Sequence, residues 1–167
     1  IQIRLVGSEM CIRDSPYAAL EFRFASSEIK NPDGTVVFRA ENIEVPVQFS
    51  QVATDIMAQK YFRKAGVPAQ TKTVEESAVP SWLWCSVPDK AALVKLPEEE
   101  RFSGESSAKQ VFNRLAGTWT YWGWKGGYFS DEEDARTYYD EMCYMLAAQM
   151  AAPNLSLIHI SEPTRRI

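Results

Sequence analysis

The first regular pattern in the chain is an alternation of apolar and polar residues with a period of two. It runs from Leu20 to Phe24, and a less regular alternation follows from Val37 to Arg39. Between the two lies Asn31–Gly34, where Pro presets φ, Asp favours a local turn and Gly accepts positive φ. The pattern predicts an antiparallel hairpin over residues 20–30 and 35–42. We expect 43–47 to extend the second strand, with Pro46 marking its edge or exit.

A helical pattern with an apolar stripe is predicted over residues 50–64. The stripe consists of two neighbouring rows with a spacing of four residues. One row is Val52, Ile56 and Lys60, and the next is Ala53, Met57 and Tyr61. Ser50 is the expected N-cap and Gly66 the stop, with Pro68 beyond. The basic residues Lys60, Arg63 and Lys64 would lie in the last turn, where they suit the helix dipole.

Residues 67–105 are less regular and are interrupted by prolines. One short helix is expected within 89–100. The side chains of Glu98–Glu100 are expected to be exposed to solvent. A second clear helix is predicted over 106–116. It opens at Ser106 or Ser107 and stops near Gly117.

The strongest helical signal covers residues 131–151. Ser130 followed by Glu133 indicates a capping box, and the acidic residues at 131–134 suit the positive N-terminal turn. The apolar stripe consists of Ala135, Tyr138, Tyr139, Met142, Leu146 and Met150. Pro153 should end the helix near Ala151. Together these elements predict an α+β fold, with a hairpin first and a mostly helical region after it.

Both ends of the chain resemble translated sequencing adapter. Residues 155–165 are what one strand of a transposase-library adapter encodes, and residues 5–15 are what its complementary strand encodes in one frame. We therefore expect 1–15 and 155–167 to be adapter-derived rather than native, with the assignment of 1–4 left open. Such segments are set aside before a fold is derived. The native segment would be 16–154, a length that fits one domain.

The composition of residues 16–154 excludes several kinds of catalytic and metal site. The chain has one histidine, His159, which lies in a flank, and a net charge of −4. Within 16–154, an imidazole zinc site, a Cys–His dyad, a Ser–His–Asp triad and a cobalamin-binding module with an axial histidine are therefore excluded. The acidic balance argues against nonspecific nucleic-acid binding, because phosphate contacts require clustered Lys and Arg.

Cysteine usage and hydropathy favour a cytoplasmic location. Of three cysteines, Cys11 lies in a flank, and Cys85 and Cys143 are far apart with no CxxC spacing. That suits a reducing compartment. No apolar run within 16–154 approaches the roughly 20 residues that a membrane span needs, so no membrane association is expected.

The aromatic run Trp119–Phe129 is the first candidate site. Its rings could stack on a base or sugar, and Lys125 beside Gly126 and Gly127 could meet a phosphate. This would make the chain a small non-enzymatic binding module. The favoured interpretation is that the rings pack in the core or against other subunits, with the glycines relieving crowding, because no phosphate-loop signature flanks them.

Three acidic groups could hold a metal or serve acid–base chemistry: Glu75–Glu76, Glu98–Glu100 and Asp131–Asp134. Their carboxylates are contiguous in sequence rather than convergent, which favours solvated faces and a helix N-terminus. Cys143 falls mid-helix among apolar neighbours, which indicates a buried, inert thiol. Cys85, beside Trp84, is read in the same way. No residue set here supports catalysis or metal binding by itself.

Four stretches of the chain carry a family resemblance: Ser27–Gly34, Gln51–Pro68, Ser107–Gly126 and Met145–Asn154. They resemble the N-terminal region of bacterial adenosylcobalamin-dependent (class II) ribonucleotide reductases over nearly all of 16–154. The third stretch, rich in Trp and Gly, is the most specific.

The resemblance implies a much longer parent enzyme built on a ten-stranded α/β barrel, on which this region would pack. It would reduce ribonucleotides, expected to be diphosphates, to 2′-deoxyribonucleotides. Adenosylcobalamin would generate a thiyl radical on a barrel cysteine, and two further cysteines would reduce the 2′-carbon. Deoxynucleotide effectors, a thioredoxin-type reductant and a homodimer are the implied partners.

The resemblance places none of those reactive residues in this chain. In the family, the run corresponding to Ala151–Asn154 continues into the barrel and the substrate site, whereas this chain departs at Leu155. Asn154 would border the missing site. In the family a serine follows this asparagine, but Ser156 lies one place too late and is adapter-encoded, so it does not correspond to that serine. Cys85 and Cys143 receive no redox role. We therefore expect no catalytic, cofactor-binding or metal-binding residue here, and a fragment without turnover.

Overall fold

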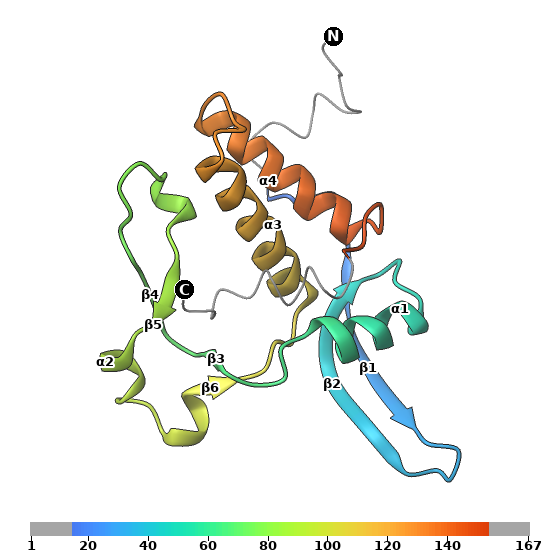
Figure 1. Ribbon diagram of the computed structural model, residues 1–167. Coiled ribbons are helices and arrows are strands. Elements are labelled where there is room, and N and C mark those ends of the chain that lie inside the picture. Colours follow the sequence, from blue (N-terminus) through green and yellow to red (C-terminus); the bar gives the residue numbers. More distant parts are fainter. Residues whose placement is uncertain (1–14, 154–167) are drawn as a thin grey trace.

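A computed structural model of the protein describes residues 15–153; Asn154 and both outer flanks lie outside the described residues. The chain forms a β-hairpin, then a short helix, an irregular segment with small strands, and two long helices (Figure 1). The expected order, hairpin first and helices after it, is confirmed. The elements are β1 (Phe22–Lys30), β2 (Val36–Pro46), α1 (Gln51–Ile56), η1 (Met57–Tyr61), β3 (Val67–Pro68), β4 (Thr71–Thr73), η2 (Ser81–Leu83), β5 (Ser86–Pro88), α2 (Lys90–Leu93), η3 (Glu98–Glu100), β6 (Phe102–Ser103), α3 (Ala108–Lys125) and α4 (Glu132–Ala147).

The hairpin forms where the alternation predicts it. β1 and β2 pair antiparallel, with Arg23 opposite Val45 and Ile29 opposite Phe38. At the turn, the Asn31 amide donates to the Thr35 carbonyl over 2.8 Å, and Gly34 has φ +88°. The predicted extension of the second strand is confirmed, and the strand ends at Pro46 as expected.

A β-bulge divides the hairpin into two halves. Ala25 lies opposite Ile43, but Ser27 lies opposite Ala40, so β2 carries one extra residue between these pairs. Asn42 has φ +54° there, a left-handed conformation that Asn accepts more readily than most residues. Bulges bend the strand that carries them, and the half beyond this one projects away from the helices (Figure 1).

The hydrophobic core lies where the first half of the hairpin meets α1, α3 and α4. The rings of Phe49 and Phe112 meet edge to face, with centroids 6.5 Å apart. The buried cluster comprises Ile43, Val45, Phe49, Met57, Ala58, Phe62, Ala108, Val111, Phe112, Leu115, Leu146 and Ala147. It joins the hairpin to both long helices in a single core.

The predicted helix over 50–64 is shorter and less regular than expected. Ser50 caps it as predicted, its hydroxyl accepting the Ala53 amide over 3.2 Å. The α-helix ends at Ile56, and a π-helical turn carries the chain to Tyr61. The basic residues expected in its last turn therefore fall partly beyond it, and the Lys64 ammonium reaches back to the Ala58 carbonyl.

Of the two apolar rows expected on this helix, the row with Val52 and Ile56 is exposed, whereas the row with Met57 packs in the core. Val52 is 67% exposed and Ile56 48% exposed, whereas Thr54, Met57 and Ala58 are buried. Both sides of this helix carry apolar residues, so the repeat alone does not say which side meets the core. Packing against the hairpin selects the side with Thr54.

The segment 67–105 contains two small sheets that the sequence did not predict. β3 pairs with β6, and β4 pairs with β5, each antiparallel. Strands of two or three residues are too short to show a period of two. The helix expected within 89–100 is reduced to α2, which Asp89 caps, and to a single 3₁₀ turn at Glu98–Glu100, whose carboxylates are exposed as predicted.

The prediction that the second helix stops near Gly117 is wrong. Ser107 and Gln110 form a capping box, and α3 then continues to Lys125. A glycine inside a helix costs about 1 kcal/mol relative to Ala, but packing of α3 along α4 outweighs this cost. Gly117 lies against the Tyr139 ring, where a Cβ would be 3.8 Å from the nearest ring atom.

The third predicted helix shifts by one residue at its start and is shorter at its end. Asp131 caps α4 instead of Ser130: its carboxylate accepts the Asp134 amide, and the Asp134 carboxylate accepts the Ser130 amide. The helix ends at Ala147, before the predicted Ala151, and Gln149 takes φ +57°. The end of the predicted stripe, Met150, is therefore exposed beyond the helix.

A buried ion pair ties α3 to the end of η1. The Arg114 guanidinium donates to both Glu105 carboxylate oxygens over 3.0 Å and to the Tyr61 carbonyl over 3.1 Å. The Glu105 carboxylate also accepts the Arg63 amide over 2.9 Å. The two side chains are only 7% and 4% exposed, so removal of either leaves the other charge poorly solvated.

We therefore predict that Arg114→Met lowers the free energy of unfolding by about 3–5 kcal/mol, because the buried Glu105 carboxylate loses its partner. Urea denaturation of the whole chain followed by tryptophan fluorescence would measure it. Arg39→Met is the matched control: Arg39 pairs with Glu41 at the surface, and exposed pairs contribute less than about 1 kcal/mol. Equal losses in the two variants would contradict this role.

Candidate functional site

The aromatic run Trp119–Phe129 does not form one surface. Most of it lies in the second half of α3, where successive residues point about 100° apart. Trp122 is 41% exposed and Thr120 is fully buried. After the helix, Tyr128 is 84% exposed, whereas Phe129 packs on Tyr138 with ring centroids 5.3 Å apart. The rings therefore serve separate contacts rather than one stacking platform.

One side of α3 binds the loop at residues 76–78. The Tyr121 hydroxyl donates to a Glu76 carboxylate oxygen over 2.9 Å, and the Lys125 ammonium pairs with the same carboxylate at 2.6 Å. The Trp124 indole N–H donates to the Ala78 carbonyl over 2.7 Å. These bonds hold the irregular segment against the long helix.

Lys125 is therefore engaged with Glu76. Its hydrogen bond holds the pKa of the Glu76 carboxyl below its usual range, with a smaller contribution from Tyr121, and the pKa of Lys125 is raised in turn. An anion approaching Lys125 would meet the Glu76 carboxylate. The arrangement does not support a phosphate contact at Lys125, the alternative that the sequence left open.

The nearby glycines make room for rings, as the packing interpretation expects. A Cβ at Gly123 would lie 2.6 Å from the Phe129 ring, and one at Gly126 would lie 2.7 Å from the Tyr128 ring. Gly127 has φ +69°, the left-handed conformation common after a helix. This geometry accounts for all three glycines without a ligand.

The other acidic candidates do not converge. Glu75 is exposed, and Asp131–Asp134 surround the start of α4, where they complete its capping. Among residues 15–153, no three His, Cys, Asp or Glu side chains are grouped to hold a metal ion.

The two cysteines lie in different environments. Cys143 is fully buried, as predicted, and burial raises the pKa of its thiol to about 11. The Asn113 side-chain oxygen accepts from both the Cys143 thiol and the Tyr17 hydroxyl, over 3.6 Å and 2.6 Å. The thiol is thus neutral at physiological pH, which suits an inert packing role. The expectation that Cys85 is buried in the same way is wrong: it is exposed, because it lies just before the short surface strand β5 rather than within a packed helix.

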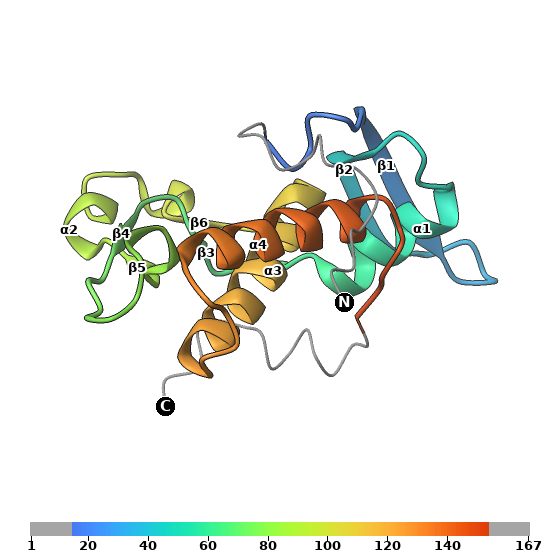
Figure 2. The ribbon, with the colours of Figure 1, turned by 90° about the horizontal axis from the view of Figure 1, so that it is seen from above.

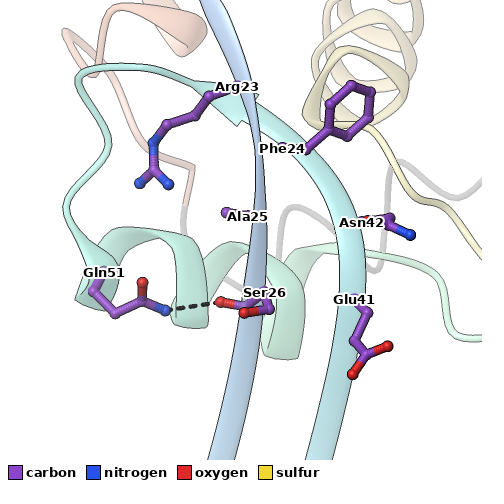
Figure 3. A pocket seen from close by; sticks show the side chains of 7 residues that line it. All are labelled: Arg23, Phe24, Ala25, Ser26, Glu41, Asn42 and Gln51. Carbon is purple, nitrogen blue, oxygen red and sulfur yellow. Dashed lines mark hydrogen bonds between the residues drawn. The ribbon is translucent and has the colours of Figure 1, made fainter.

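A shallow hollow of about 530 Å³ lies at the bulge (Figure 3), and the sequence analysis did not predict it. It is lined by Arg23, Phe24, Ala25, Ser26, Glu41, Asn42 and Gln51. Its longer polar side chains already have protein partners: Arg23 donates to the Phe49 carbonyl, Gln51 to the Ser26 carbonyl, and Glu41 pairs with Arg39. The one sequence signal that could have pointed to the bulge is Asn42, a residue type that tolerates positive φ.

Asn154, the one residue expected to border a substrate site, lies outside the described residues. In the described part of the chain, none of the helices combines the length and the hydropathy required to cross a bilayer.

A pair of glycine substitutions tests the packing interpretation. We predict that Gly117→Ala stabilises the chain by about 0.5–1 kcal/mol, because it gains helix propensity without a close contact. Gly123→Ala has the same intrinsic gain but drives a methyl group into the Phe129 ring, so it should be neutral or destabilising. Urea denaturation of both variants gives the comparison. A full gain of stability in Gly123→Ala would contradict this account.

Comparison with known proteins assigns the chain to a family. The family model for class II vitamin B12-dependent ribonucleotide reductase matches residues 23–149. Proteins named vitamin B12-dependent ribonucleotide reductase from Bradyrhizobium diazoefficiens and Agrobacterium fabrum are 66% and 67% identical over 140 residues, 84% of this chain. A third, from Rhodopirellula baltica, is 28% identical over 149 residues, 88% of this chain.

The matched segment is a small part of each relative, since the chain spans 11% of the length of all three. The match nevertheless covers most of the chain, including the hairpin and both long helices. The chain belongs to the class II vitamin B12-dependent ribonucleotide reductases, of which it carries the N-terminal domain.

Proposed function

We propose that this chain is a structural N-terminal part of an enzyme that reduces ribonucleotides to 2′-deoxyribonucleotides for DNA synthesis. The observation that carries the proposal is the identity of about two thirds to two named reductases over 84% of the chain. We propose ribonucleoside diphosphates as the substrates, and this choice rests on the family resemblance alone.

The proposed cofactor of the whole enzyme is adenosylcobalamin, and the residues described here do not fit it. They include no histidine, and the hollow at the bulge is open, with most of its polar side chains bonded to the protein itself. Small-molecule sites are usually concave, with converging polar groups. We therefore place cofactor binding, and with it the radical chemistry that the cofactor supplies, in the rest of the enzyme.

In the whole enzyme, this region would have a structural role and would supply no reactive group. Its buried thiol is neutral, its aromatic rings are divided among separate contacts, and its carboxylates cap helices or pair with lysine and arginine. We propose that it packs on the barrel of the whole enzyme. We propose that the whole enzyme is a cytoplasmic homodimer, and that its thioredoxin-type reductant and deoxynucleotide effectors act on other regions.

A chimera tests this function. Residues 16–153 would replace the matched region in the Agrobacterium fabrum relative, and reduction of CDP and CTP would be measured with adenosylcobalamin and a dithiol. We expect turnover comparable to that of the unmodified relative, with preference for CDP, and no turnover by the 167-residue chain alone.

Two controls define the outcome. A deletion of the matched region should abolish turnover if the region supports the barrel. A soluble, folded chimera without activity, or turnover by the 167-residue chain alone, would contradict the proposal.

A further inference from the structure

The segment at residues 15–20 is attached to the fold through few contacts. Its backbone hydrogen bonds are internal turns, such as the one from the Leu20 amide to the Tyr17 carbonyl over 2.9 Å. Among the described residues, every hydrogen bond from this segment to the rest of the chain involves the Tyr17 hydroxyl. Its apolar contacts with the core cluster come from Tyr17 and Leu20. The segment, in blue, lies at the edge of the molecule and leads into β1 (Figure 2).

The Tyr17 side chain reaches both long helices. Its hydroxyl donates to the Asn113 side-chain oxygen of α3 over 2.6 Å. Its ring packs against Phe112 of the same helix, with centroids 6.4 Å apart, and against Phe22 at 5.7 Å. The Cys143 thiol of α4 donates to the same Asn113 oxygen over 3.6 Å, and the thiol also lies within hydrogen-bonding reach of the Tyr17 hydroxyl. The hydroxyl and the thiol therefore share one amide oxygen.

This arrangement closes one side of the thiol. Cys143 is fully buried, so a reagent in solution reaches its sulfur only after a neighbouring group moves. The other polar neighbours, Asn113 and Tyr139, lie within the regular backbone of α3 and α4. Tyr17 lies on a segment that is bonded to no sheet or helix through its backbone. Segments of this kind open at a lower free energy than the core around them.

We propose that residues 15–20 act as a strap, latched by Tyr17, whose opening uncovers the Cys143 thiol while the core stays folded. The coupling is reciprocal, as linkage requires. A group attached to the Cys143 sulfur would occupy the place of the Tyr17 hydroxyl, so the modified chain would hold its strap open. The strap is a conformational device of the N-terminal segment, and it does not depend on the function proposed above.

Alkylation of the 167-residue chain with iodoacetamide tests the strap. A sulfur–carbon bond forms as the carbon–iodine bond breaks, iodide leaves and the thiol proton passes to the buffer. The labelled peptides would be quantified by mass spectrometry at several low urea concentrations, with the exposed Cys85 as the reference for the reagent. We expect the labelling rate at Cys143 to be nearly independent of urea, because opening a short segment exposes little surface.

Two substitutions of the latch extend the test. Tyr17→Phe keeps the ring and removes the hydroxyl, so Cys143 should be labelled about 2- to 10-fold faster, the effect of losing one net hydrogen bond. Tyr17→Ala also removes the ring contacts, so labelling should be faster by about tenfold or more. Tyr121→Phe is the matched control, because its hydroxyl binds Glu76 instead of the strap. Labelling of Cys143 in this control should be unchanged.

The urea dependence separates local opening from unfolding of the whole chain, which tryptophan fluorescence would follow in parallel. A Cys143 labelling rate that rises with urea as steeply as global unfolding would overturn the strap. Unchanged labelling in both Tyr17 variants would overturn the role of Tyr17 as its latch. Should Tyr17→Ala fail to fold, the rate in Tyr17→Phe and the urea dependence of the unsubstituted chain decide between the two outcomes.

Discussion

The arrangement of this region depends on the buried ion pair between Glu105 and Arg114. The guanidinium reaches the Tyr61 carbonyl, and the carboxylate reaches the Arg63 amide, so one pair fixes the end of η1 against α3. A buried pair is not by itself a large source of stability, because desolvation offsets much of the attraction. Its importance is geometric: the ion pair and the bonds to Tyr61 and Arg63 form together only when the elements around Tyr61 and Glu105 meet α3 in this one arrangement.

That arrangement also sets which surfaces are left open. With η1 fixed, the Thr54 side of α1 faces the hairpin, and Val52 and Ile56 face outward. The Tyr61 hydroxyl is then placed to hold Pro153, where the described chain ends. The same contacts that close the core therefore also hold the end of the described chain beside η1.

Local signals in the sequence predicted the hairpin and the main helices, whereas tertiary contacts decided where these elements end. The Asn31–Gly34 turn and the Ser50 and Ser107 caps act within a few residues, so they could be read directly. Gly117 was misread as a helix end because its neighbour, Tyr139, comes from another helix. Glu76 pairs with Lys125, which is distant in the sequence, and Glu105 pairs with Arg114, which does not share a helix with it. No sequence signal therefore predicted either contact. The family was recognisable from its motifs, but the arrangement of the aromatic run required the structure.

The central claim is that this region gives the reductase structure and none of its reactive thiols. The most direct measurement is ribonucleotide reduction by the chimeric enzyme with Cys85→Ser and Cys143→Ala introduced together. The account predicts that turnover and its dependence on the dithiol reductant remain those of the unsubstituted chimera. Loss of turnover in a folded double variant would show that one of these thiols takes part in the reaction, and would contradict the claim.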